Sequence, residues 1–373
     1  MNFKGLRFDF YQFMGNAIMH IPIKIKCHYD VTIVRTDAIG DYVIWHDSLV
    51  AYKKRFAGKK VLLICAEIVK PLAEDDPFFS TVIGINNKRM LTNLSYLLSI
   101  QRELKMIGSE IVLNPVRQRH RIGDFLVKCL HSDNKIGIDG TGDIIMRYYN
   151  KSYTRLVTAP LCESELEAVE YFTREVISDS YSYGYAKWDI KPVDSSSFKK
   201  LQYAVIAISS SDKYRSWEID KFTKVVDSIP EKYTIIISGA GASDLERSTQ
   251  LISNSRTASR IINKVNKTSL PQLVSLISGA SFLIGNDSAA VHIAAAVHTP
   301  SIAICPGAHF GRFIPYPERM PYKEFHPIVV NARLDCYGCN YFCTKEIKGN
   351  YECLRLITVE EVVNKLDELL KTI

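Results

Sequence analysis

The chain has 373 residues, of which 47% are hydrophobic and 23% charged, close to the average of folded proteins. This length suggests two domains, and the composition excludes a disordered chain, a collagen-like chain and a small disulfide scaffold. The net charge of +7 is mild and comes without a run of five or more lysines and arginines, so we expect no nucleic-acid partner.

Residues 1–30 are expected to form an N-terminal extension that is neither a membrane span nor a secretion signal. Its apolar side chains are interspersed with lysines and arginines, so it could form a helix on an anionic membrane surface. A helix that packs on the protein's own surface is an equal alternative. The longest uncharged stretch, 288–311, is interrupted by histidines and prolines and predicts no spanning helix. We therefore expect a cytoplasmic protein whose nine cysteines are mostly thiols.

Strands and helices alternate in the first half of the chain. Residues 31–34 predict a strand, followed by a loop to Gly40. Apolar residues then recur at spacings of three and four over 42–56, which is typical of one face of a helix. Residues 60–65 and 111–113 predict further strands. Strand, loop, helix and strand in this order predict a parallel sheet.

The polar stretch at 150–200 predicts a boundary between a first domain, 31–195, and a second domain, 196–373. The second domain again predicts strands, at 203–208, 234–238, 282–285 and 301–305. Its helices are expected to run to about 253, from 269 to 278, from 288 to 297 and from 358 to 370. The predicted fold is two doubly wound α/β domains that face each other across a cleft. Ligands of such sheets bind beyond the carboxyl ends of the strands.

The segment from Arg35 to Asp41 places a glycine and an aspartate between the first strand and the next helix. Gly40 permits a tight turn, and Asp41 could act as a general base at the carboxyl edge of the sheet. An equal alternative is that Asp41 only caps the helix.

Asp287, Ser288 and His292 lie where a predicted strand runs into an Ala-rich helix. Small side chains there let an anion approach the free N–H groups, and the helix dipole favours a phosphate. The alternative is a capped helix that holds a hydrogen-bonded, buried histidine.

The segment 209–217 combines serine hydroxyls with Arg215, which suits phosphate oxygens. Gly239 and Gly241 follow the next strand and could contact a nucleotide or make only a turn. The chain lacks the G-x-G-x-x-G fingerprint at a first βα unit, which counts against a dinucleotide-dependent oxidoreductase.

Four of the nine cysteines, Cys336, Cys339, Cys343 and Cys353, fall within 18 residues. A C-x2-C pair followed by two more cysteines is typical of a structural site of four thiolates for zinc or mononuclear iron. The second pair is spaced more widely than usual, so free thiols or disulfides are equal alternatives.

Together these motifs resemble those of the ADP-heptose:lipopolysaccharide heptosyltransferases, glycosyltransferase family nine. That family has an (S/D)-x-x-G-D loop, here 37–41, and a K/R-x-W segment, here 215–217. Its strongest mark is D-(S/T)-G-x-x-H before an Ala-rich helix and T/R-P, here 287–292 and 299–300. Many members also carry a C-x-x-C and further cysteines before the final helix. The order and spacing agree over roughly residues 31–370.

The resemblance implies a GT-B fold and an inverting, metal-independent transfer of heptose from ADP-heptose to a hydroxyl of a glycan or lipopolysaccharide-type acceptor. Asp41 would be the base, in the loop with Gly40. The residues that would bind the donor are Ser210, Ser211, Arg215, Gly239, Asp287, Ser288 and His292, with Asp244 at the ribose. The family's glycine after D-(S/T) is Ala289 here, and its methyl group could crowd the donor. Catalysis would need no cofactor, and zinc or iron at the cysteines would be structural.

The alternative function is a non-catalytic protein that binds a sugar nucleotide or a glycan. It would keep Arg215 and the helix start at Asp287 but would not need Asp41. A structural role at the membrane would rest on residues 1–26 alone. For the enzyme we expect a glycan or lipid-linked acceptor and peripheral contact with the cytoplasmic face of the inner membrane.

Overall fold

The computed structural model describes residues 24–139, 148–158, 164–184, 187–188, 202–210 and 213–373. The first 23 residues of the predicted extension and the predicted boundary at 195–196 lie outside these ranges, so both predictions stay untested. The chain forms two compact units. The N-terminal unit runs to residue 162 and includes 167–182, whereas the C-terminal unit consists of 163–166 and 183–373.

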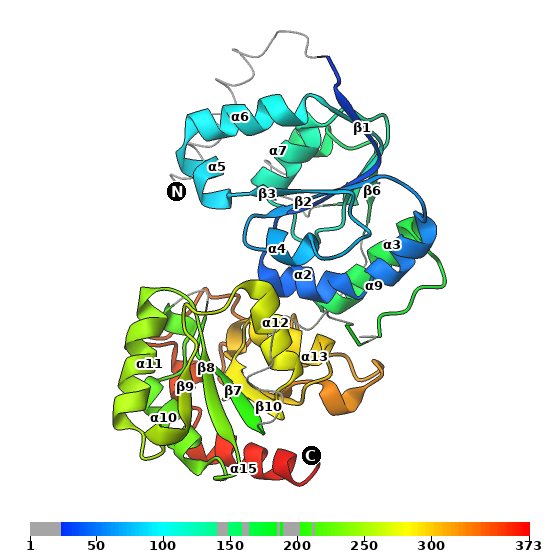
Figure 1. Cartoon of the computed structure of the whole chain (residues 1–373). Helices are drawn as coiled ribbons and strands as arrows, with labels where there is room; N and C mark the ends of the chain where they lie inside the picture. Colours follow the sequence, from blue (N-terminus) through cyan, green and yellow to red (C-terminus); the bar gives the residue numbers. More distant parts are fainter. Residues whose placement is uncertain (1–23, 140–147, 159–163, 185–186, 189–201, 211–212) are drawn as a thin grey trace. The chain divides into compact units, whose positions relative to one another are not determined.

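Each unit contains a six-stranded parallel sheet in the doubly wound strand order (Figure 1). The N-terminal sheet has the order β3-β2-β1-β4-β5-β6, formed by β1 (Cys27–Arg35), β2 (Val61–Ala66), β3 (Thr81–Ile85), β4 (Ile107–Asn114), β5 (Lys135–Ile138) and β6 (Arg155–Val157). The C-terminal sheet has the order β12-β11-β10-β7-β8-β9, formed by β7 (Tyr203–Ala207), β8 (Thr234–Ser238), β9 (Ile261–Asn263), β10 (Phe282–Asn286), β11 (Ser301–Ile304) and β12 (Ile328–Val330).

The strand order reverses between β1 and β4 in one sheet and between β7 and β10 in the other. Loops that leave adjacent strands at such a switch point turn to opposite faces of the sheet and open a crevice at the carboxyl ends of the strands. The loop 36–41 follows β1, the segment 208–217 follows β7, and Asp287 follows β10. The topology therefore brings the predicted functional segments to the switch points of the two sheets.

Helices flank both sheets. Those of the N-terminal unit are α2 (Ile39–His46), α3 (Leu49–Arg55), α4 (Lys70–Ala73), α5 (Asn87–Thr92), α6 (Leu94–Leu104), α7 (Arg121–Cys129) and most of α9 (Glu165–Val176). Those of the C-terminal unit are α10 (Ile219–Ser228), α11 (Ala242–Asn254), α12 (Leu270–Ser278), α13 (Ala289–Ala296), α14 (Glu352–Arg355) and α15 (Val359–Leu370). In the C-terminal unit α10 and α11 lie on one side of the sheet, and α12 and α13 lie on the other (Figure 1). Among the described residues, no helix is long and apolar enough to cross a bilayer.

Continuous apolar runs build the central strands because both faces of a parallel sheet are covered. All six residues of β2 are buried, and so are all five of β7 and β10. The helices predicted to start at 269 and 358 are present, and each starts with a capping box, at Ser269 before α12 and at Thr358 before α15. Each satisfies N–H groups that a helix start would otherwise leave without partners.

The single helix predicted over residues 42–56 is wrong. The structure has two helices, α2 and α3, separated by Asp47 and Ser48. The Ser48 hydroxyl donates to the carbonyl of Trp45 at 2.6 Å, and Asp47 accepts the hydroxyl of Tyr181 at 2.6 Å. The apolar spacing survives the break because Trp45 and Tyr52 still lie buried on the same side, ring against ring.

The described part of the polar stretch at 150–200 contains regular structure. It includes the edge strand β6 and the helix α9, whose Leu166, Val169 and Phe172 are buried. An amphipathic helix with a half-polar face raises the average polarity of a stretch without breaking its order.

Candidate functional site

Arg35, at the end of β1, holds the loop that precedes α2. Its guanidinium donates to the carbonyl of Pro115 at 3.1 Å and to that of Asp41 at 2.9 Å. It also pairs with the carboxylate of Asp37 at 3.0 Å. Arg35 is 4% exposed, so these contacts replace the water that a buried cation loses. The backbone of Asp41 is thereby fixed to the edge of the N-terminal sheet.

Asp41 lies inside the first turn of α2 and is not its cap. The N-cap position belongs to Ala38, and Gly40 and Asp41 are the second and third residues of the helix. The alternative that Asp41 serves only as the N-cap is therefore wrong, although a carboxylate in the first turn still favours the helix dipole. The side chain is half-buried. A fixed backbone and a partly accessible carboxylate are what a general base requires.

Asn286, the last residue of β10, joins the segments at the C-terminal switch point. Its fully buried side chain donates to the carbonyl of Ile208 at 2.9 Å and accepts the N–H of Trp217 at 2.9 Å. These bonds hold both ends of the segment that carries Arg215. No sequence motif marks Asn286, although an asparagine that ends an apolar strand is a usable signal of such a role.

Arg215 and Asp287 meet beside the start of α13. A guanidinium nitrogen of Arg215 lies 3.8 Å from the Asp287 carboxylate. Burial raises the pKa of Asp287, and the charge of Arg215 opposes that rise. The Arg215 side chain keeps 20% of its surface exposed, whereas that of Asp287 keeps 5%. A partly exposed cation held against a buried acid can turn its outer face to an anion.

Ser288 occupies the N-cap position of α13, but its side chain makes no capping hydrogen bond. The first residues of the helix are Ala289 and Ala290, whose small side chains leave the N–H groups of the first turn approachable. The predicted helix start is confirmed within one residue. The alternative, a helix start capped by a side chain, is wrong for Ser288, because its hydroxyl forms no capping hydrogen bond.

His292 is a buried, hydrogen-bonded histidine, as the alternative reading expected. Its Nδ1 lies 2.8 Å from the Tyr316 hydroxyl, and the two rings stack. Burial lowers the pKa of His292 to about 4. The ring is therefore neutral near pH 7 and offers no charge to a phosphate, so a role of His292 in donor binding would have to be steric or through hydrogen bonds.

Asp244 braces two loops of the C-terminal unit. One carboxylate oxygen accepts the hydroxyl of Ser209 and, at 2.9 Å, the N–H of Ala240. The other lies 3.9 Å from the guanidinium of Arg247. A Cβ at Gly239 would stand 2.9 Å from this carboxylate, so glycine is needed for the close approach. These contacts favour a bracing role for Asp244 and Gly239, and their predicted contacts with the donor remain a prediction.

Of the two serines predicted to bind phosphate, only Ser210 belongs to the described residues. Ser210 follows β7 and is half-buried. Ser211 lies outside the described residues, so its predicted role stays untested.

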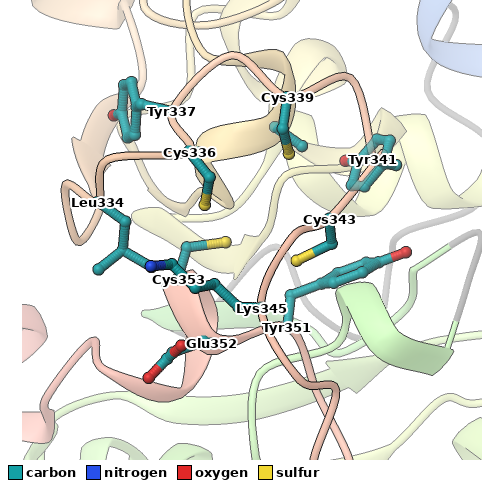
Figure 2. Close-up of a pocket in the computed structure, with 12 residues that line it drawn as sticks. Leu334, Cys336, Tyr337, Cys339, Tyr341, Cys343, Lys345, Tyr351, Glu352 and Cys353 are labelled. Carbon is teal, nitrogen blue, oxygen red and sulfur yellow. The ribbon is translucent and has the colours of Figure 1, made fainter.

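The four cysteines of the C-terminal cluster line one small cavity. Cys336, Cys339, Cys343 and Cys353 are free thiols that turn toward the same cavity in Figure 2. Burial raises the pKa of Cys336 and Cys353, and the neighbouring cysteines raise both further. The alternative of disulfides does not occur in this arrangement. Among the described residues, no three histidines, cysteines or acids stand close enough together to hold a metal ion.

Comparison with known proteins identifies the family. Residues 120–337, more than half of the chain, match glycosyltransferase family 9 (heptosyltransferase). The chain belongs to glycosyltransferase family 9. Lipopolysaccharide heptosyltransferase 3 of Escherichia coli strain K12 is 26% identical over 348 residues, which cover 89% of this chain and 95% of the relative.

Solved structures share the fold of this family 9 chain. The glycosyltransferase family 9 protein of Veillonella parvula DSM 2008 has a TM-score of 0.70 at 19% identity, covering 95% of this chain and 99% of that one. E. coli heptosyltransferase WaaC, solved with ADP-2-deoxy-2-fluoro heptose, has a TM-score of 0.67 at 16% identity, covering 91% and 99%. The predicted family and the predicted GT-B fold are confirmed.

Tyr341 is a further residue of this family 9 chain that no sequence motif marks. Its ring centroid lies 4.8 Å from the guanidinium carbon of Arg215. A tyrosine between two cysteines gives no signal of contact with an arginine so far away in the sequence. Only the folded loop places the ring.

Proposed function

We propose that the chain transfers a heptose from ADP-heptose to a hydroxyl of a lipopolysaccharide-type acceptor, with inversion at the anomeric carbon. Family membership supports the reaction class. The names of the relatives support the choice of donor and acceptor, since one is a lipopolysaccharide heptosyltransferase and another was solved with an ADP-heptose analogue. The observation that carries the donor site is Arg215, held against Asp287 beside the open first turn of α13.

The C-terminal unit would bind the diphosphate of the donor. Arg215 supplies a cation with hydrogen-bond donors, and the first N–H groups of α13 supply the positive end of a helix dipole. The charge that develops on the leaving ADP would be stabilised by these groups, so the transfer would need no metal ion. The hydroxyls of Ser210 and Ser211 would donate to the same phosphates.

Asp41 of the N-terminal unit would act as the base. It would take the proton of the acceptor hydroxyl while that oxygen forms a bond to the anomeric carbon. The bond from the anomeric carbon to the diphosphate oxygen breaks, and ADP leaves with the electron pair. Attack from the face opposite the leaving group inverts the configuration. Arg35 would keep the base in place because it holds the backbone of Asp41.

Asp41→Asn tests this assignment. We expect single-turnover transfer from ADP-heptose to fall by roughly 10²–10⁴-fold, while calorimetry finds nearly unchanged affinity for ADP. Asp220→Asn is the matched control, because Asp220 is also an acid in the first turn of a helix, α10. Normal turnover of Asp41→Asn would contradict the role of base. A wild-type chain that binds ADP-heptose but transfers nothing would instead be the non-catalytic binder.

We also propose that the four cysteines bind one structural zinc or iron ion. The donor set fits, because four free thiols face one cavity and thiolates are preferred ligands of both ions. Binding would have to draw the sulfurs closer together than they stand here. Four thiolates leave no open coordination position, so the ion would order the loop and take no part in the transfer.

The proposed acceptor implies a cellular location for the reaction. A lipid-linked acceptor would be reached from the cytoplasmic face of the inner membrane, where the positive net charge of +7 favours contact with anionic lipid. Residues 1–23, outside the described structure, are the proposed contact.

A further inference from the structure

We propose that Tyr341 is a positioning residue for Arg215, and that the cysteine segment, residues 336–353, thereby sets the affinity for the donor's diphosphate. This inference rests on the proposed function, because it assumes that Arg215 binds the donor. It adds a role for a segment to which the proposed function assigns only a structural metal ion.

The first observation is that two groups hold the Arg215 guanidinium. Its carbon lies 4.8 Å from the centre of the Tyr341 ring, and one of its nitrogens lies 3.8 Å from the Asp287 carboxylate. A guanidinium over an aromatic face is attracted to it and loses freedom of rotation. An arginine fixed in this way loses less entropy when it binds a diphosphate than a freely rotating one.

The second observation is that the Tyr341 ring is itself held. The His309 ring meets it edge-on at 4.5 Å, and the Tyr351 ring lies 5.4 Å away. Tyr341 has a positive φ of 64°, and Asn340 before it has one of 51°. Bulky residues rarely adopt this conformation, and they keep it only where the surroundings impose it. The N–H of Asn340 donates to the carbonyl of Ala308 at 3.0 Å, which anchors the turn.

The third observation concerns the far end of the cysteine segment, which holds the backbone on both sides of Arg215. The N–H of Tyr351 donates to the carbonyl of Tyr214 at 3.1 Å. The side chain of Asn350 donates to the carbonyl of Ser216 at 2.7 Å. The segment therefore holds Arg215 by its side chain through Tyr341 and by its neighbours through Asn350 and Tyr351.

The exposure of the segment agrees with this geometry. Tyr341 is half-buried. Phe342, the next residue of the same segment, is 80% exposed. The segment thus turns one aromatic residue toward Arg215 and its neighbour toward solvent, which provides a matched control.

The test compares the affinity for ADP among variants by titration calorimetry, with melting temperatures as the check on folding. Tyr341→Leu removes the aromatic face, and we expect ADP to bind about tenfold more weakly. Tyr341→Phe keeps the ring, so its affinity should stay within about twofold of wild type. Phe342→Leu should bind ADP as wild type does. If Tyr341→Leu does not fold, Tyr341→Met replaces it.

A double-mutant cycle with Arg215→Ala separates positioning from other roles. In that background, Tyr341→Leu should weaken ADP binding no further, because the cation that Tyr341 holds is gone. In steady-state assays, Tyr341→Leu should raise the donor KM more than it lowers kcat. If the losses of ADP affinity in the two single variants add in the double variant, or if Tyr341→Leu binds ADP as wild type does, the inference is overturned. The proposed function would not be affected by either result. A wild-type chain without affinity for ADP or ADP-heptose would overturn the proposed function, and the inference with it.

Discussion

Burial disfavours charge on the acid and the histidine near the start of α13. It raises the pKa of Asp287 and lowers that of His292 to about 4, because a charge without water is costly. Arg215, whose guanidinium is charged in proteins generally, keeps part of its surface exposed and has the Asp287 side chain beside it. The positive charge that we propose for the donor site is therefore that of Arg215. The motif histidine, His292, instead forms a hydrogen bond with the Tyr316 hydroxyl.

The buried imidazole predicts a dependence of stability on pH. The folded state holds His292 neutral down to about pH 4, whereas the unfolded chain protonates it below its ordinary value of 6.5. The free energy of unfolding should therefore fall as pH drops from 6.5 to 4, by up to roughly 1.4 kcal/mol per pH unit from this group. Above pH 6.5 the contribution is constant.

Denaturant titrations of wild type and His292→Gln between pH 7 and pH 4 test this slope. Glutamine can still bond to the Tyr316 hydroxyl but does not titrate in this range, so the variant should lose less stability on acidification. His131→Gln, at an exposed position, is the control and should follow wild type. Parallel curves for wild type and His292→Gln would contradict the assignment.

At the scale of elements, short irregular segments do more to form the proposed donor site than the regular ones. The sheet brings β7 and β10 side by side, and Asn286 ties the loops that follow them. The cysteine segment then contacts Arg215 from outside the sheet. Such a segment has no ladder of hydrogen bonds to order it, so a bound metal ion would have a large effect on it.

Metal content is the prediction that belongs to this element. Protein purified without added metal should contain about one zinc or iron ion per chain, bound by four thiolates. Cys336→Ser should lose the ion, lower the melting temperature and weaken ADP binding through Tyr341. Cys27→Ser changes an exposed cysteine outside the segment and should do none of these. A metal-free wild type with four titratable thiols would contradict the metal site.

At the scale of the whole molecule, the described residues include two hydrophobic clusters that belong to different units. One is built on the N-terminal sheet and the other on the C-terminal sheet. A ligand stabilises the unit that binds it, and a saturating ligand at 100 times its Kd adds about 2.7 kcal/mol. Because the proposed donor groups belong to the C-terminal unit, the effect of ADP should be confined to that unit.

Hydrogen exchange can measure this confinement. With ADP at 100 times its Kd, amides of β7, β8 and β10 should gain about 2.7 kcal/mol of protection, while those of β1 and β2 should not change. At the same ADP concentration, Arg215→Ala should gain much less protection. Equal protection of both sheets would mean that the two units unfold together.

The sequence alone identified the two sheets, most strand positions, the helix starts at 269 and 358, and the family. These are local signals, because apolar runs, spacing and cap residues act within a few positions of the chain. They failed where local signals are ambiguous. The periodicity over 42–56 cannot show that the helix is interrupted at Asp47 and Ser48, since Tyr181, the partner of Asp47, comes from far along the chain.

The sequence likewise showed which motif residues belong to the candidate site, but it did not show the structural role of each one. Asp41 was found, but only the structure showed that Ala38 takes the cap position. Asp244 was found, but its carboxylate braces Ser209 and Ala240. Only the tertiary structure placed the Tyr341 ring against Arg215, because that contact joins distant segments whose meeting depends on the order of the strands and on the turn at Asn340.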